Sequence, residues 1–245
     1  MSDILYTIRE AVSACNVVDL SPVLENDIPR WPTHPPLVIH PTVTHAHDGY
    51  YCQTMFLGEH TGAHVDAPAH QVSAMMESTI ETYPPDYLCG VAVTYPLYQL
   101  DAKPGQRITA DQILSLEAKM GTAAGEDEIV LLDFHWFRYW SAGADWKYYA
   151  KNEPGLSEDA VRLFAERRVR AVGSDTIACD TPVIAGEEME SYGHHMHWLP
   201  NHILIMEELQ NLDKLPVRSY FIAVPLKIRN GSGSPIRPFA FVPRN

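Results

Sequence analysis

The sequence predicts a mixed α/β fold, with a mixed sheet and flanking helices. Two observations support this expectation: helix and strand patterns alternate through the middle third of the chain, and further strand patterns lie outside that region. At 245 residues the chain can bury a sizeable core, and we expect residues 1–245 to form one domain. Hydrophobic residues make up 46% and charged residues 20%, which is typical of a globular protein.

The first expected element is a short amphipathic helix over residues 3–14. Its apolar side chains lie roughly on one face: Ile4, Leu5, Ile8 and Val12. That face needs a partner, either the core or another subunit. Residues 1–14 are therefore a candidate oligomerisation helix.

Two strands are expected next, over residues 37–47 and 50–57. Asp48-Gly49 lies between them, and this pair accepts the positive φ angles of a tight hairpin turn. The following segment contains Gly62 and Pro68, which argue against a continuous helix. We expect a turn or a short broken helix there.

The middle third contains two well-punctuated helices. Residues 109–121 begin with a Thr109 cap and Gln112 three residues later, and Gly121 follows the end. Residues 156–168 repeat this pattern, with Ser157 as the cap. Strands are expected over 91–100, 127–134, 169–175, 202–206 and 219–228.

The charge balance argues against nucleic acid as a partner. With 18 Lys and Arg against 31 Asp and Glu, the formal charge of −13 repels a phosphate backbone. No apolar run approaches the ~20 residues of a membrane span, and the N-terminus lacks the apolar region of a signal peptide. The four cysteines form no CxxC pair, which favours free thiols. We expect a soluble cytoplasmic protein that binds neither nucleic acid nor membrane.

Residues 60–70 read HTGAHVDAPAH and contain four candidate metal-binding or acid/base residues. Three imidazoles and one carboxylate, a set that suits Zn²⁺ or a similar divalent ion, lie within eleven residues: His60, His64, Asp66 and His70. A cation so held lowers the pKa of bound water towards neutrality, so the segment indicates a hydrolase. His70 is the best candidate for an acid/base group that is not a ligand.

A second group of histidines lies in residues 194–209. Its titratable residues are His194, His195, His197, His202, Glu207 and Glu208. Asp66 could bridge two ions, because a carboxylate has two oxygens, and an imidazole and a carboxylate from this group could complete a two-metal site. The residues alone do not choose among these histidines.

HTGAHVDAPAH resembles the HxGTHxDxPxH signature of the cyclase-like metal hydrolases, the family of bacterial kynurenine formamidase and isatin hydrolase. The resemblance extends to residues 17–36, 154–176 and 223–241, and so covers most of the chain. Ala63 departs from the threonine that is usual in the signature. The resemblance implies a swivelling β/β/α fold.

The resemblance also implies a role for individual residues. His60, His64 and Asp66 would hold the first metal, and Asp66 would reach the second. Alignment without a gap adds His195 and Glu207, although His194 and His197 stay open as alternatives. His70 matches the catalytic acid/base, and Trp31 matches a tryptophan that lines the pocket of an aromatic substrate.

The expected function is metal-dependent cleavage of an amide C–N bond in an aryl formamide or cyclic amide, of the N-formylkynurenine or isatin type. The aromatic stretch 134–140 would help Trp31 to hold a flat ring. The cofactor would be one or two Zn²⁺ or Mn²⁺ ions per subunit, since nitrogen and oxygen ligands accept both. A homodimer or homotetramer is expected. The alternatives are a lactone hydrolase, as for dienelactones, and a non-catalytic metal-binding protein. GSGSP (231–235) reads as a turn, with its contact to the site left open.

Overall fold

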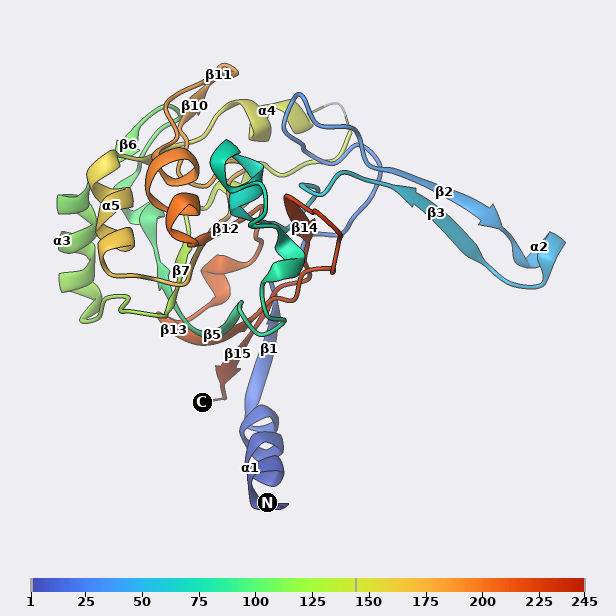
Figure 1. The fold of residues 1–245 in the computed structure, drawn as a ribbon, viewed down its shortest axis with the longest axis horizontal. Helices are drawn as coiled ribbons and strands as arrows, with labels where there is room; N and C mark the ends of the chain where they lie inside the picture. Colours follow the sequence, from blue (N-terminus) through green and yellow to red (C-terminus); the bar gives the residue numbers. More distant parts are fainter. Residues whose placement is uncertain (1, 144, 245) are drawn as a thin grey trace.

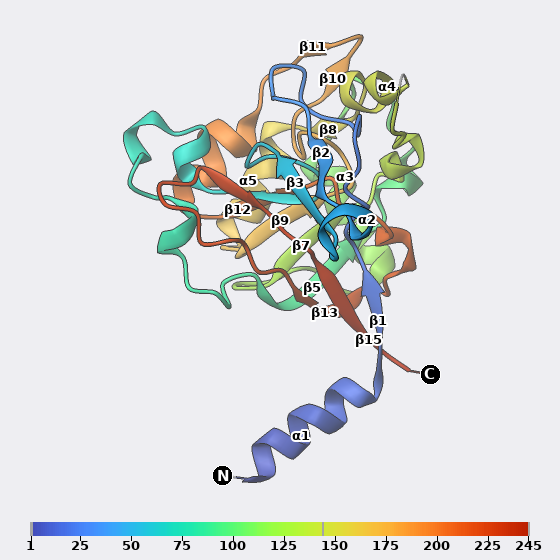
Figure 2. The same ribbon diagram turned by 90° about the vertical axis from the view of Figure 1, so that its right-hand side faces the viewer.

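The computed structural model describes residues 2–143 and 145–244 (Figures 1 and 2). Its centre is a nine-stranded mixed sheet, which confirms the predicted α/β class. In spatial order the strands are β1 (Cys15–Asp19), β15 (Phe239–Pro243), β13 (Arg218–Ile222), β5 (Cys89–Tyr95), β7 (Ile129–Leu132), β9 (Ala171–Ser174), β12 (Leu204–Glu207), β4 (His64–Asp66) and β14 (Gly233–Pro235). The strands from β5 to β12 are parallel, and antiparallel pairs extend the sheet on both sides.

The remaining elements are short. The described helices are α1 (Ser2–Ser13), α2 (His45–Asp48), α3 (Ala110–Met120), α4 (Trp146–Lys151) and α5 (Glu158–Glu166). Three small pairs complete the strands: β2 (Val38–Val43) with β3 (Cys52–Phe56), β6 (Arg107–Ile108) with β8 (Gly155–Leu156), and β10 (Val183–Ile184) with β11 (Glu187–Glu188). None of the helices in the described ranges has the length and apolarity that crossing a bilayer requires.

Helices α3 and α5 lie beside each other on one face of the sheet (Figure 1). The predicted N-cap of α3 is confirmed: Thr109 and Gln112 satisfy each other's backbone amides in a capping box, and Gly121 adopts a φ of 69° at the other end. Ser157 precedes α5 as predicted. Its hydroxyl donates to the Ile108 carbonyl, however, and does not cap the helix.

Alternating side chains of the central strands separate two hydrophobic cores. In β12, Ile205 packs on the side of α3 and α5, whereas Leu204 and Met206 pack on the opposite side. In β4, Val65 belongs to the same opposite core. Successive side chains of a strand point to opposite faces of the sheet. His64 and Asp66, which flank Val65, therefore point to the face that carries Ile205.

Two segments project from the body. The β2–β3 hairpin forms a long arm, and α1 extends alone beyond the sheet (Figures 1 and 2). The hairpin confirms the two predicted strands, but the prediction of a tight turn at Asp48-Gly49 was wrong. Residues 45–48 form one helical turn instead, closed by the Asp48 carboxylate on the Thr44 amide at 3.0 Å, and Gly49 alone takes a positive φ.

Candidate metal centre

The segment 60–70 forms a strand in its middle, where a turn or broken helix was predicted. β4 lies between β12 and β14, and its short run of three residues pairs with both. His64 lies directly opposite Glu207 in the β12 register. Because directly opposed residues of antiparallel strands project on the same face, these two side chains are neighbours.

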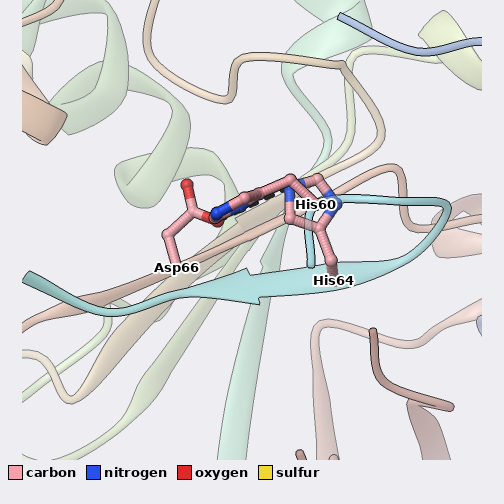
Figure 3. A group of neighbouring side chains, drawn as sticks. All are labelled: His60, His64 and Asp66. Carbon is pink, nitrogen blue, oxygen red and sulfur yellow. Dashed lines mark hydrogen bonds and ion pairs between the residues drawn. The ribbon is translucent and has the colours of Figure 1, made fainter. Parts of the chain in front are cut away.

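The first cluster joins three residues of this segment: His60, His64 and Asp66 (Figure 3). Both imidazoles point at the carboxylate. His60 Nδ1 lies 2.6 Å from Asp66 Oδ1, and His64 Nε2 lies 3.5 Å from the same oxygen. The Asp66 side chain is 1% exposed, so this carboxylate has left water and relies on these partners.

The second cluster uses the other oxygen of Asp66. His194 Nε2 lies 3.4 Å from Asp66 Oδ2 and 3.3 Å from Glu207 Oε1. Glu207 Oε2 faces His64 Nε2 at 3.3 Å. Each carboxylate therefore presents one oxygen to His64 and the other to His194. Asp66 belongs to both groups of residues that could hold a cation.

The structure brings a different histidine to the two carboxylates than the gapless alignment selects. His194, and not His195, faces Asp66 and Glu207, whereas His195 is exposed and its Nε2 lies 3.2 Å from Gln71 Oε1. The cause is the wide helical turn over 193–197, which is anchored at its end by the fully buried Trp198. The alignment without a gap therefore selects the residue that follows the histidine at the carboxylates.

The contacts of His64 and His194 have the spacing of ligands to a divalent cation, whereas His60 Nδ1 and Asp66 Oδ1, 2.6 Å apart, would have to separate to bind one. Zn–N and Zn–O bonds of 2.0–2.2 Å in a tetrahedron place ligand atoms about 3.3–3.6 Å apart. The distances from His64 and His194 to both carboxylates fall in this range, at 3.3–3.5 Å. In addition, Glu207 Oε1 is buried without a hydrogen-bond partner among the described residues. A cation would satisfy this oxygen, which otherwise carries a desolvation cost.

The electrostatics of the two clusters also favour a cation. Burial lowers the pKa of His64, but the hydrogen bond to Glu207 and the charges of Asp66 and Glu207 outweigh it and raise the pKa to about 10. Burial is likewise overcome at His194, where Asp180, Asp66 and Glu207 raise the pKa well above its usual value. Without a cation, protons therefore supply the positive charge that these carboxylates require.

His70 lies next to both clusters without belonging to either. Its Nε2 is 3.9 Å from Asp66 Oδ2, beyond hydrogen-bond distance, and its ring centroid is 3.9 Å from that of His60. Burial is the main cause that lowers the pKa of His70 to about 4, against the raising effect of Asp66. The imidazole is thus neutral at neutral pH and able to accept a proton.

A cavity of about 280 Å³ opens over the clusters. It is lined by His70, Trp31 and His34, and by both carboxylates. Trp31 therefore lies in the wall of the cavity. The cavity volume is near the lower limit of the range for small-molecule pockets. The stretch 134–140 does not line this cavity, which corrects that expectation. Its Trp136 is buried against Tyr139 instead.

Two residues that support the site were not predicted. His34 lines the cavity with its ring tilted 37° to that of His60 and 5.6 Å between the centroids, and Asp180 accepts from His194 Nδ1 at 2.7 Å. Glu208, which the sequence placed in the second group, is buried beside Glu207. The sequence contained a partial signal for His34, which lies three residues after Trp31. Asp180 stands alone in the sequence, and only the fold brings it to His194.

A cavity over paired histidine and carboxylate clusters defines a protein of the metal-dependent hydrolase class. The family model described as "Putative cyclase" matches residues 18–181. The chain is 32% identical to isatin hydrolase of Roseibium aggregatum over 224 residues, 86% of this chain and 82% of that protein. It is 25% identical to kynurenine formamidase of Sphingopyxis alaskensis, across 89% of this chain and 94% of that one.

Solved structures agree with these matches. An isatin hydrolase bound to the product analogue thioisatinate has a TM-score of 0.82 at 26% identity and covers 99% of both chains. Isatin hydrolase A from Ralstonia solanacearum has a TM-score of 0.81 at 27% identity, over 98% of this chain and 97% of that one. The chain belongs to the cyclase family, and the prediction of a metal-dependent hydrolase of this family is confirmed.

Proposed function

We propose that the protein hydrolyses the C–N bond of an aryl formamide or a cyclic amide, of the N-formylkynurenine or isatin type. The two named relatives, an isatin hydrolase and a kynurenine formamidase, support this substrate class. Trp31 in the wall of the cavity supports a flat aromatic substrate. The cavity volume of about 280 Å³ suits a small molecule and leaves no room for a polymer chain.

The observation that carries the proposal is the position of His70. This neutral imidazole lines the cavity, close to the clusters but outside them. His70 would take a proton from the attacking water and pass it to the departing nitrogen. A protein that only stores a cation has no use for such a base.

The cation would be Zn²⁺ or Mn²⁺, held at two sites. His60, His64 and Asp66 would form the first site, and Asp66, His194 and Glu207 the second. A cation bound there supplies the Lewis acid that polarises the carbonyl group and acidifies water. The protein's own part is to orient the substrate against Trp31 and to move the proton through His70.

A substrate screen tests the reaction. Protein reconstituted separately with Zn²⁺ and Mn²⁺ is assayed with N-formylkynurenine, isatin and a dienelactone. We expect turnover of at least one of the two amides, and none of the lactone. Turnover of the lactone alone would replace the amide proposal with the ring-ester alternative. No turnover in either metal form would favour a non-catalytic metal-binding protein.

Cation binding should release protons. His64 and His194 hold protons near neutral pH, and the cation must displace them from the nitrogens that face Asp66 and Glu207. The apparent affinity for Zn²⁺ should therefore rise with pH until about pH 10, the pKa of His64, because fewer protons then compete with the cation. Calorimetric titrations in two buffers of different ionisation enthalpy measure the released protons. Equal heats in both buffers would contradict the expectation.

We also propose a homodimer or homotetramer, supported by α1. Its apolar residues are 43–69% exposed, and the helix lies away from the sheet (Figure 2): Ile4, Leu5, Ile8 and Val12. Burying one such side chain contributes about 1.5–3 kcal/mol, so an interface on this face would stabilise an oligomer.

The double variant Ile4→Glu/Ile8→Glu tests this interface. We expect it to weaken self-association by 100-fold or more, since two buried side chains account for about 3 kcal/mol. Light scattering across a dilution series gives the mass. Glu10→Lys changes the opposite side of the helix and should leave the mass unchanged. An unaltered mass in the double variant would rule out α1 as the interface.

A further inference from the structure

The GSGSP segment contacts the first metal cluster through His60. β14 lies along β4, with Gly233 opposite Asp66 in the register. A Cβ at Gly233 would lie 2.6 Å from His60 Cε1 and 2.5 Å from the Val65 carbonyl oxygen, so the strand can pack this closely only at a glycine. The imidazole of His60 therefore rests against the start of β14, which Ser232 immediately precedes.

The directions of the hydrogen bonds around Ser232 are determined by Glu59. Glu59 Oε2 accepts from the Ser232 amide at 2.9 Å and from its hydroxyl at 2.6 Å. Because an ionised carboxylate only accepts, the hydroxyl hydrogen must point to Glu59. Ser232 Oγ is then left as the acceptor for the Nε2–H of His60, 2.9 Å away.

This chain of contacts selects one nitrogen of His60 for the metal. With Nε2–H donated to Ser232, Nδ1 is the nitrogen that faces the cluster. Nδ1 lies 2.6 Å from Asp66 Oδ1, and because a carboxylate only accepts, this contact uses an Nδ1 hydrogen that a bound cation would replace. His64 and His194 are arranged in the opposite way. Their Nδ1 atoms lie 2.7 Å from the Gly62 carbonyl and from Asp180 Oδ1, and their Nε2 atoms face the carboxylates.

We propose that Glu59 and Ser232 are positioning residues that fix the tautomer of His60 and present its Nδ1 to the first cation. The inference rests on the metal sites of the proposed function. Partners that orient a metal-binding histidine typically affect metal affinity by about 10–100-fold. Since Ser232 contacts His60 alone among the candidate ligands, its effect should fall on the first site and spare the second.

The variant Ser232→Ala tests the proposal in a Zn²⁺ titration against a chromophoric chelator. We expect one of two binding steps to weaken by about 10–100-fold and the other to persist. Ser232→Thr keeps a hydroxyl and should restore most of the affinity. Ser234→Ala is the matched control, because Ser234 lies in the adjoining strand β14 and, among the described residues, its hydroxyl bonds to Leu226 and Pro235 and not to a candidate ligand.

A second measurement separates positioning from general destabilisation. In long-range ¹H–¹⁵N spectra of the Zn²⁺-loaded protein, His60 should show an Nε2–H ring, whereas His64 and His194 should show Nδ1–H rings. Glu59→Gln keeps an acceptor oxygen without the charge, and we expect it to retain this pattern with a smaller loss of affinity than Ser232→Ala.

The outcomes distinguish a failure of the proposed metal centre from a failure of the positioning role of Ser232. Wild-type protein that binds no Zn²⁺ would overturn both the metal centre and the role of Ser232. Wild-type binding with an Nδ1–H ring at His60, or equal affinity in Ser232→Ala, would overturn only the positioning role. A fall in affinity of equal size in Ser234→Ala would do the same, since it would trace the effect to the strand.

Discussion

Replacement of His70 by alanine should lower kcat by about 10²–10⁴, the usual contribution of a positioned acid/base group, with the cation content unchanged. The structural reason is that His70 Nε2 lies 3.9 Å from Asp66 Oδ2, outside both clusters, while the side chain lines the cavity. Its removal therefore takes away the proton carrier and leaves every proposed ligand in place. Steady-state kinetics with the amide identified in the screen, together with elemental analysis, measure both quantities.

His197→Ala provides the control for a lost imidazole. His197 pairs with Glu158 outside the cavity, so this variant should keep both its turnover and its cations. If His70→Ala retained wild-type kcat, another group would carry the proton. If it lost a cation, His70 would be a ligand and not a base.

The second large effect is expected at His194. His194→Ala takes from the buried carboxylates of Asp66 and Glu207 one of the two imidazoles that they share, and only His64 remains. Without a cation, this should lower the free energy of unfolding by about 3–5 kcal/mol, as for other broken buried ion pairs. The variant should also bind one cation fewer than the wild type. Denaturant unfolding and elemental analysis give the two numbers.

His195→Ala is the matched comparison, since the two histidines are adjacent. His195 is exposed and contacts only Gln71 among the hydrogen-bond partners in the described ranges. We expect wild-type stability and cation content in this variant. The reverse pattern, with the cation lost in His195→Ala and kept in His194→Ala, would restore the ligand predicted by alignment.

Much of the fold could be predicted because its signals are local. The N-cap of α3 requires only Thr109 and Gln112, three residues apart, and the structure contains the complete box. The end of the hairpin could not be predicted in this way. The sequence of residues 45–48 is compatible with a strand or with a helical turn. The structure has the helical turn, in which the Asp48 carboxylate accepts from the Thr44 amide.

The residues of the candidate site also divide into those with local sequence signals and those without. His60, His64 and Asp66 fall within seven residues, so the sequence alone brings them together. The choice of His194 depends on a wide helical turn, and the roles of Asp180 and Ser232 depend on contacts between segments far apart in the chain. Aspartate and serine are common residues, and no spacing distinguishes these two.

The position of β4 determines when the centre can form during synthesis. This three-residue strand pairs only with β12 and β14 in the described sheet, and both follow it by more than a hundred residues. A nascent chain that has just left the ribosome with residues 60–70 has no strand on which to align His64 and Asp66. The sheet around them closes only after residues 233–235 emerge, so the cation should load only once those residues have left the ribosome.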